Sequence, residues 1–204
     1  EREAKKMTGQ FKLQPADILV STNDRGDPWS RIKRWGVGPY DHVSLYLGRM
    51  GLFVYRKQPR ILRVPMIFES VPAQGVCLRQ LSERYGEKVV VMRLKSEHDR
   101  KRIPHVLLAA IDLASNDSAQ YDFICIPLHI IPRILNEKFG MPIPVKYHHN
   151  EWHVCSEGVQ VVFIRGRLYE ILGPLCVPPL PGDFVTDSPL LSKAWCGDLS
   201  AEWV

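Results

Sequence analysis

The sequence predicts an α+β domain on two observations. Short runs with the composition of β-strands gather in the first half of the chain, and amphipathic helical patterns flank them. The chain has 204 residues, of which 45% are hydrophobic and 24% charged, which suits one packed domain and argues against general disorder. We therefore expect a single domain over residues 13–204, preceded by an N-terminal extension at residues 1–12.

Six runs have the β-branched, apolar or alternating pattern of strands. They are residues 17–21, 42–48, 51–55, 64–71, 75–79 and 88–94. Gly48 is expected to end the second run, and the turn 72–75 separates the fourth from the fifth. Residues 24–40 are rich in Gly, Pro, Asp and Arg, so they are expected to form a loop.

Two helices are expected in the second half of the chain. Ser96, followed three residues later by Asp99, predicts the capped start of an amphipathic helix that runs to Ala114, with Pro104 tolerated near its beginning. A second, short helix is expected to start at Cys155. The tail from Gly173 onward is proline-rich and is expected to be mostly irregular.

Residues 123–147 combine bulky apolar side chains with four prolines and are expected to form an insertion with broken helices. Three interpretations of it stay open. It packs on the core, it forms a lid or substrate wall over a site, or it touches a membrane surface.

The charge of the chain is concentrated in one segment. The net charge is +5, which is too small to indicate a nucleic-acid partner. From Asp24 to Arg63 there are nine basic residues and three acidic ones, a balance of +6, which leaves the rest of the chain at −1. Because this segment brackets His42, we expect it to attract an acidic substrate, such as a carboxylate-bearing peptide or an anionic lipid head group.

Composition also bears on the compartment. No uncharged run reaches the about 20 residues of a membrane span, and no signal-peptide pattern is present at the start, where Met7 is a candidate initiator. Five scattered cysteines without a Cys-x-x-Cys spacing favour neither a disulfide framework nor a zinc ribbon. A reducing, cytoplasmic compartment is favoured, and export stays open if an N-terminal segment was removed.

Three side chains are candidates for catalysis from their positions alone. Cys155 stands where a helix begins, and helix N-terminal amides stabilise a thiolate. His42 opens a strand, where an imidazole could act as a base for a cysteine on a facing helix. Glu69 ends a later strand, either as an ordinary strand end or as the group that orients a histidine. From position alone, a structural role is the commoner one for Cys155 and for His42.

Together these residues resemble a known family. The blocks are Asp17-Ile-Leu-Val, Asp41-His-Val-Ser-Leu-Tyr-Leu-Gly, Phe68-Glu-Ser-Val-Pro-Ala-Gln-Gly-Val, Tyr121-Asp-Phe and Cys155-Ser-Glu-Gly-Val. Their order, with histidine before cysteine, resembles the circularly permuted NlpC-type papain-like family, in its YiiX-like branch, with lecithin retinol acyltransferase as a distant relative. The linker from Arg49 to Pro65 is longer and more basic than a tight hairpin needs, and Gly158 replaces a bulky apolar residue of the family.

The resemblance implies a permuted papain-like fold and a cysteine hydrolase of amide bonds. It implies that Cys155 is the nucleophile, His42 the general base and Glu69 the residue that holds the imidazole, with Tyr121 polarising the scissile carbonyl. The expected substrate is a cell-wall peptide, such as a peptidoglycan fragment, or an acyl-amide. Two alternatives stay open: a lipid acyltransferase or thioesterase on the same fold, and a binding module without catalysis.

No metal or cofactor is expected. His149 and His153 have helical i, i+4 spacing, but position 150 is Asn rather than the Glu of the His-Glu-x-x-His zinc motif. Histidines at 148, 149 and 153 are therefore interpreted as packed or exposed side chains just before the nucleophile. The oligomeric state is left open by the sequence.

Overall fold

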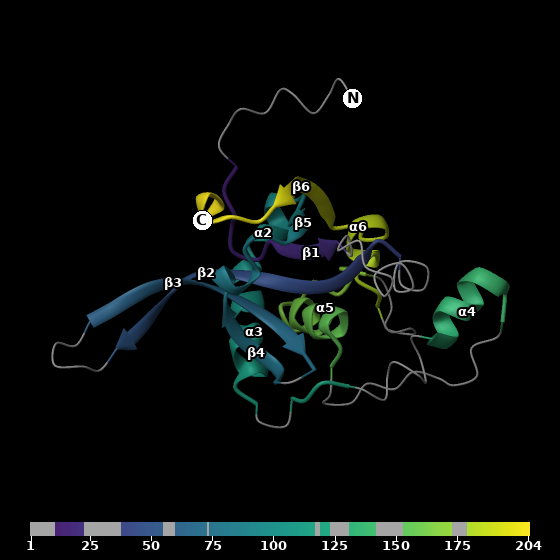
Figure 1. Ribbon diagram of the computed structural model, residues 1–204, viewed down its shortest axis with the longest axis horizontal. Coiled ribbons are helices and arrows are strands. Elements are labelled where there is room, and N and C mark those ends of the chain that lie inside the picture. Colours follow the sequence, from purple (N-terminus) through teal and green to yellow (C-terminus); the bar gives the residue numbers. More distant parts are fainter. Residues whose placement is uncertain are drawn as a thin grey trace, which may run out of the picture.

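The computed structural model describes residues 11–22, 38–54, 60–72, 74–116, 119–122, 131–141, 153–172 and 179–204. Within these residues one antiparallel sheet has the strand order β4-β3-β2-β1-β5-β6 (Figure 1). Its strands are β1 (Ile18–Thr22), β2 (Tyr40–Val54), β3 (Arg60–Val71), β4 (Gly75–Gln80), β5 (Lys88–Leu94) and β6 (Leu191–Asp198). The expected α+β class is confirmed.

Short helices connect and cover the sheet. They are η1 (Leu81–Arg84), α2 (Glu97–Arg100), α3 (Ile103–Ala114), α4 (Ile131–Phe139), α5 (Cys155–Arg165), α6 (Asp183–Thr186) and η3 (Ala201–Trp203). Figure 1 shows α3 and α5 together on one side of the sheet. Helix α4 is tied to α6 by an ion pair in which Arg133 Nη1 lies 2.7 Å from Asp183 Oδ2. None of the helices in the described part of the chain has the length and apolarity that a membrane span requires.

Alternation along the strands gives the sheet two apolar faces. On β2, Val43, Leu45 and Leu47 point toward α3 and α5 and join the larger core. Tyr46 points to the other face, where a smaller core is closed by residues from both ends of the described chain, including Phe11 and Trp203. The sheet therefore separates two cores, and α5 belongs to the larger one.

Gly48 does not end its strand, and that prediction was wrong. The ladder between β2 and β3 shifts register between Tyr46 and Gly48, and Gly48 has a φ of +92°. A glycine in the left-handed region accommodates an extra residue as a bulge, so the strand continues to Val54. The expected runs 42–48 and 51–55 are therefore one long strand.

The helix expected from Ser96 to Ala114 is divided into α2 and α3. The Ser96 hydroxyl accepts a hydrogen bond from the His98 amide at 3.1 Å, so the predicted cap is present. Pro104 lies in the first turn of α3, where its missing amide proton costs little. The interruption before Ile103 allows α3 to start anew along the sheet.

The tail expected to be irregular contains an edge strand, so that prediction was wrong. Strand β6 pairs with β5 from Lys88↔Asp198 to Leu94↔Leu191. Its apolar alternation is weak because most of its side chains are partly or fully exposed. In the insertion, α4 and residues up to Met141 are described, while 123–130 and 142–147 lie outside the described residues, as do 23–37 of the expected loop.

Candidate active site

Cys155 is the first residue of α5, as expected from the apolar pattern that follows it. Val154 before it is extended, with ψ 165°, and no side chain caps the helix. The first turn is nevertheless fully enclosed, and the Ser156 hydroxyl donates to the carbonyl of Pro179 at 2.6 Å. The thiol therefore lies at a helix N-terminus, with 8% of the residue exposed.

The start of α5 lies where β2 and β3 separate. Their ladder ends at Leu45↔Phe68, although β2 continues with β1 and β3 continues with β4. At this end the backbone amide of Val43 hydrogen-bonds to the Cys155 sulfur, instead of continuing a ladder with β3. On the β3 side, the Ser70 hydroxyl donates to the His153 carbonyl at 2.6 Å. Both strands therefore hold the nucleophile in place.

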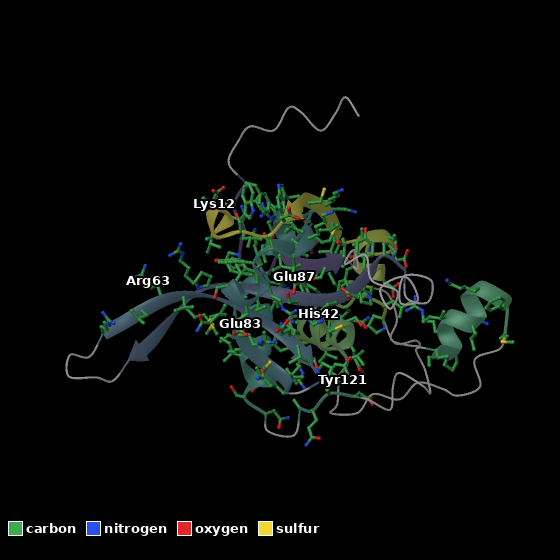
Figure 2. The ribbon with its side chains drawn as sticks, in the orientation of Figure 1. Lys12, His42, Arg63, Glu83, Glu87 and Tyr121 are labelled. Atoms are coloured by element: carbon green, nitrogen blue, oxygen red, sulfur yellow. The ribbon has the colours of Figure 1, made fainter. Side chains whose placement is uncertain are left out.

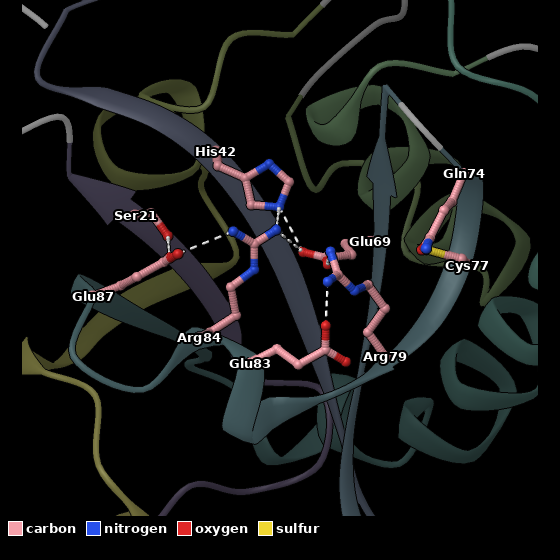
Figure 3. Close-up of polar contacts among 9 residues, drawn as sticks. All are labelled: Ser21, His42, Glu69, Gln74, Cys77, Arg79, Glu83, Arg84 and Glu87. Atoms are coloured by element: carbon pink, nitrogen blue, oxygen red, sulfur yellow. Dashed lines mark hydrogen bonds and ion pairs between the residues drawn. The ribbon is translucent and has the colours of Figure 1, made fainter.

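The same end of the sheet brings His42 and Glu69 together. His42 Nε2 lies 2.7 Å from Glu69 Oε2, and Glu69 is completely buried (Figure 3). His42 also hydrogen-bonds to the side chain of Cys155. Because Nε2 is directed at Glu69, Nδ1 is the ring nitrogen left for the thiol. Three residues from three separate elements thus form a continuous Cys–His–Glu chain.

Burial and neighbouring charges shift the pKa of His42 in opposite directions, and the same holds for Cys155. Burial alone lowers the pKa of His42, but the neighbouring Cys155 and Glu69 outweigh it and raise that pKa to about 9. Burial raises the pKa of the Cys155 thiol, but His42 and the Val43 and Ser156 amides more than reverse this, so the pKa is lowered. The pair therefore favours thiolate and imidazolium.

Glu69 keeps its charge although it is buried. Burial raises its pKa, while His42 and Arg84 lower it by more, so the net pKa is lowered. The Arg84 Nη2 lies 2.7 Å from Glu69 Oε2, and the Arg79 Nη1 lies 3.3 Å from Oε1. An ionised carboxylate is the form that can accept a hydrogen bond from the imidazole N–H and orient the ring.

Arg84 is a functional candidate that the sequence reasoning missed. Besides Glu69, it donates to Glu87 at 3.0 Å, and Glu87 accepts from the Ser21 hydroxyl at 2.9 Å. Its Nη2 also lies 3.3 Å from His42 Nε2 (Figure 3). Arg84 ends the short helix η1, and no spacing in the sequence relates it to His42, which is 42 positions away. Only the fold brings them together.

Tyr121 lies in a segment that runs beside the residues preceding Cys155. The His153 amide donates to the Gln120 carbonyl at 2.9 Å, and the Val76 amide donates to the Ala119 carbonyl at 3.0 Å. Tyr121 therefore follows Gln120, whose carbonyl is hydrogen-bonded two residues before α5 begins. Its catalytic role stays a prediction.

A cleft of about 730 Å³ opens beside His42. The charged residues along it are four acidic ones and two basic ones, and these are Asp41, Glu83, Glu87, Asp198, Arg84 and Lys88. The described arginines of the basic segment, in contrast, are away from His42; Figure 2 shows Arg63 on the extended part of β3. The other basic residues of the segment lie outside the described residues, so the expected attraction of an acidic substrate stays a prediction.

Of the three histidines considered for a metal motif, the structure describes one, His153. His153 Nδ1 lies 3.7 Å from Glu157 Oε1, and both side chains are buried. Residues 148 and 149 lie outside the described residues. Among the residues that the structure describes, no group of three or more His, Cys, Asp or Glu side chains is arranged to hold a metal ion.

No family model matches the sequence, and no curated protein matches it. Comparison with solved structures finds the crystal structure of the metalloprotein YiiX from Escherichia coli O157:H7, described as DUF1105. The similarity has a TM-score of 0.47 and 16% sequence identity, and it covers 93% of this chain and 99% of that chain. YiiX gives its name to the branch that the sequence motifs resemble, but a similarity of this size does not establish a shared fold.

Proposed function

We propose that the chain is a cysteine hydrolase of amide bonds with a permuted papain-like fold. The observation that carries the proposal is the Cys–His–Glu chain. A thiol at a helix N-terminus hydrogen-bonds to His42, whose Nε2 lies 2.7 Å from the buried Glu69 carboxylate. Activated cysteines have this arrangement of nucleophile, base and orienting group. The order of histidine before cysteine along the chain agrees with the permuted topology.

In the proposed reaction Cys155 acts as a thiolate whose proton is already held by the His42 imidazolium. The thiolate attacks the amide carbonyl carbon, and the C=O electron pair moves to the oxygen, next to the amides that begin α5. When the C–N bond breaks, the His42 imidazolium gives its proton to the leaving nitrogen. Water, deprotonated by His42, then hydrolyses the thioester and restores the free thiol.

The first test measures the reactivity of the thiol. Cys155 is expected to react with iodoacetamide at neutral pH at least about tenfold faster than the exposed Cys196, because its pKa is lowered. His42→Ala should remove this advantage, whereas Cys77→Ser should leave it intact. Peptide mass spectrometry of partly labelled protein gives the relative rates. A Cys155 rate that does not depend on His42 would contradict the proposal.

The second test identifies the bond. The protein is incubated separately with peptidoglycan fragments and with short-chain acyl esters, and a thioester on Cys155 is sought by mass spectrometry. A thioester from the peptide fragments, absent in Cys155→Ala, supports amide hydrolysis. A thioester from the esters alone favours the lipid acyltransferase or thioesterase. No adduct from either, with wild-type biological activity in Cys155→Ser, favours a binding module.

A further inference from the structure

The feature that the proposed reaction leaves unexplained is a two-stranded arm. We define the arm as residues 48–54 of β2 and 60–65 of β3. Strand β1 pairs with β2 at residues 40–45, and β4 pairs with β3 at residues 66–71. Beyond these positions the two strands pair with each other, from Gly48↔Met66 to Val54↔Arg60. The arm therefore extends out of the sheet, as Figure 1 shows.

The arm exposes aliphatic side chains together with arginines. Ile61 is 67% exposed and Leu62 is 39% exposed, and the flanking Arg60 and Arg63 are exposed as well. Since successive strand residues point to opposite faces, Ile61 and Arg63 share one face of the arm and Arg60 and Leu62 share the other. Each face therefore pairs an apolar side chain with a guanidinium.

The charge of the arm has one sign. Within the arm the sequence contains three arginines, Arg49, Arg60 and Arg63, and no Lys, Asp or Glu. A nucleic acid would attract these cations but would not require exposed aliphatic residues. A second copy of the arm would bring like charges together. An anionic lipid surface satisfies both features, because it attracts arginines and offers an apolar layer just below its headgroups.

We propose that the arm docks the protein onto anionic membrane surfaces. Arg60 and Arg63 contact lipid phosphates, while Ile61 and Leu62 enter the boundary between the headgroups and acyl chains. Neither residue pair belongs to the Cys–His–Glu chain, so this binding is independent of the proposed reaction. It also differs from the earlier expectation of membrane contact through residues 123–147, since it uses a different part of the molecule.

The test is cosedimentation with vesicles of phosphatidylcholine mixed with phosphatidylglycerol, compared with vesicles of phosphatidylcholine alone. The protein should bind the mixed vesicles more tightly, and added salt should weaken this binding. Each of Arg60→Gln and Arg63→Gln should weaken it about fivefold, the effect expected for one cation at an anionic surface. Ile61→Ser should weaken it about tenfold, because an apolar side chain no longer enters the boundary.

Two variants serve as controls. Leu108 on α3 is 66% exposed, so Leu108→Ser removes an equally exposed aliphatic residue from another part of the molecule and should leave vesicle binding unchanged. Cys155→Ala should also bind normally, which separates docking from catalysis. Equal binding to both vesicle types would overturn the proposal. So would self-association that Ile61→Ser abolishes without any vesicle binding, or nucleic-acid binding that depends on the arginines alone.

Discussion

The Glu69 carboxylate shows how individual residues control the proposed site. It is fully buried, yet it contacts three groups that carry or can carry positive charge: His42, Arg79 and Arg84. Each partner offsets the cost of burying the carboxylate, but each guanidinium also reduces the negative charge that attracts a proton to His42. Cys155 and Glu69 raise the pKa of His42 to about 9, and we expect this pKa to change further when Arg84 beside Glu69 is replaced.

Arg84→Gln tests this dependence. In the proposed reaction His42 must be protonated to release the leaving group, so activity falls as pH rises through its pKa of about 9. Replacing Arg84 removes a cation 3.3 Å from Nε2 and leaves Glu69 less neutralised. Both changes favour the imidazolium, so the alkaline limb of the pH profile should move to higher pH.

The measurement is the NMR titration of the His42 ring, together with the pH dependence of cleavage. If Arg84 only positions Glu69, its loss weakens the His42–Glu69 bond and moves the limb to lower pH instead. Arg165→Gln is the matched control, because Arg165 is on the last turn of α5 and pairs with Asp112 at 3.3 Å. Its replacement should leave the titration of His42 unchanged.

At the level of the elements, α5 is positioned by close packing on α3. Gly166 is the capping residue directly after α5, and a Cβ added there would lie 3.1 Å from both the Cα and the backbone nitrogen of Val106. Val106 is completely buried on α3, and its backbone cannot move aside easily. The glycine therefore sets how closely the two helices approach and, through α5, where Cys155 lies.

Gly166→Ala should lower the free energy of unfolding by about 2–3 kcal/mol, because it overpacks a contact with backbone. Urea denaturation followed by circular dichroism gives this value. Gly86→Ala separates packing from backbone strain, since Gly86 has a φ of +87° and nothing within 4 Å of an added Cβ. It should cost about 1 kcal/mol through conformation alone. Equal effects of both variants would contradict the packing argument.

The elements also show where sequence patterns succeed. The strand expected at residues 88–94 has the same bounds as β5, because Val89 to Met92 alternate between the two cores and so form an unbroken apolar run. The strand end predicted at Gly48 was wrong because a glycine that ends a strand and one that forms a bulge have the same sequence pattern. Strand β6 was missed because an edge strand needs few apolar residues.

Over the whole molecule, the two ends of the described chain close the smaller core. Phe11 stacks on Trp195 with ring centroids 5.3 Å apart, and Trp203 lies 4.9 Å from Trp195. The Leu13 amide donates to the Trp203 carbonyl at 2.7 Å. This cluster is on the sheet face opposite α5, so it supports the sheet without contacting the larger core.

Trp203→Ala should lower the free energy of unfolding by about 2 kcal/mol through lost apolar burial and aromatic contact. The urea midpoint measures the loss, and Trp203→Phe should recover much of it. Below the unfolding transition, iodoacetamide labelling of Cys155 should stay at the wild-type rate, because the cluster and the thiol belong to different faces. A slower Cys155 reaction in the folded variant would show that the two faces are coupled.

The sequence by itself determined the α+β class, most strands, the start of α5 at Cys155 and the candidates His42 and Glu69. These depend on local patterns of apolar residues, glycines and caps, which the chain carries at short range. Tertiary structure alone decided the rest. The fold brings Arg84 next to Glu69. The described arginines of the basic segment lie on the arm because β2 and β3 extend beyond the strands that flank them. The sequence gives the number and position of the charged residues. Which of them come together in a buried, low-dielectric site depends on how distant strands pair.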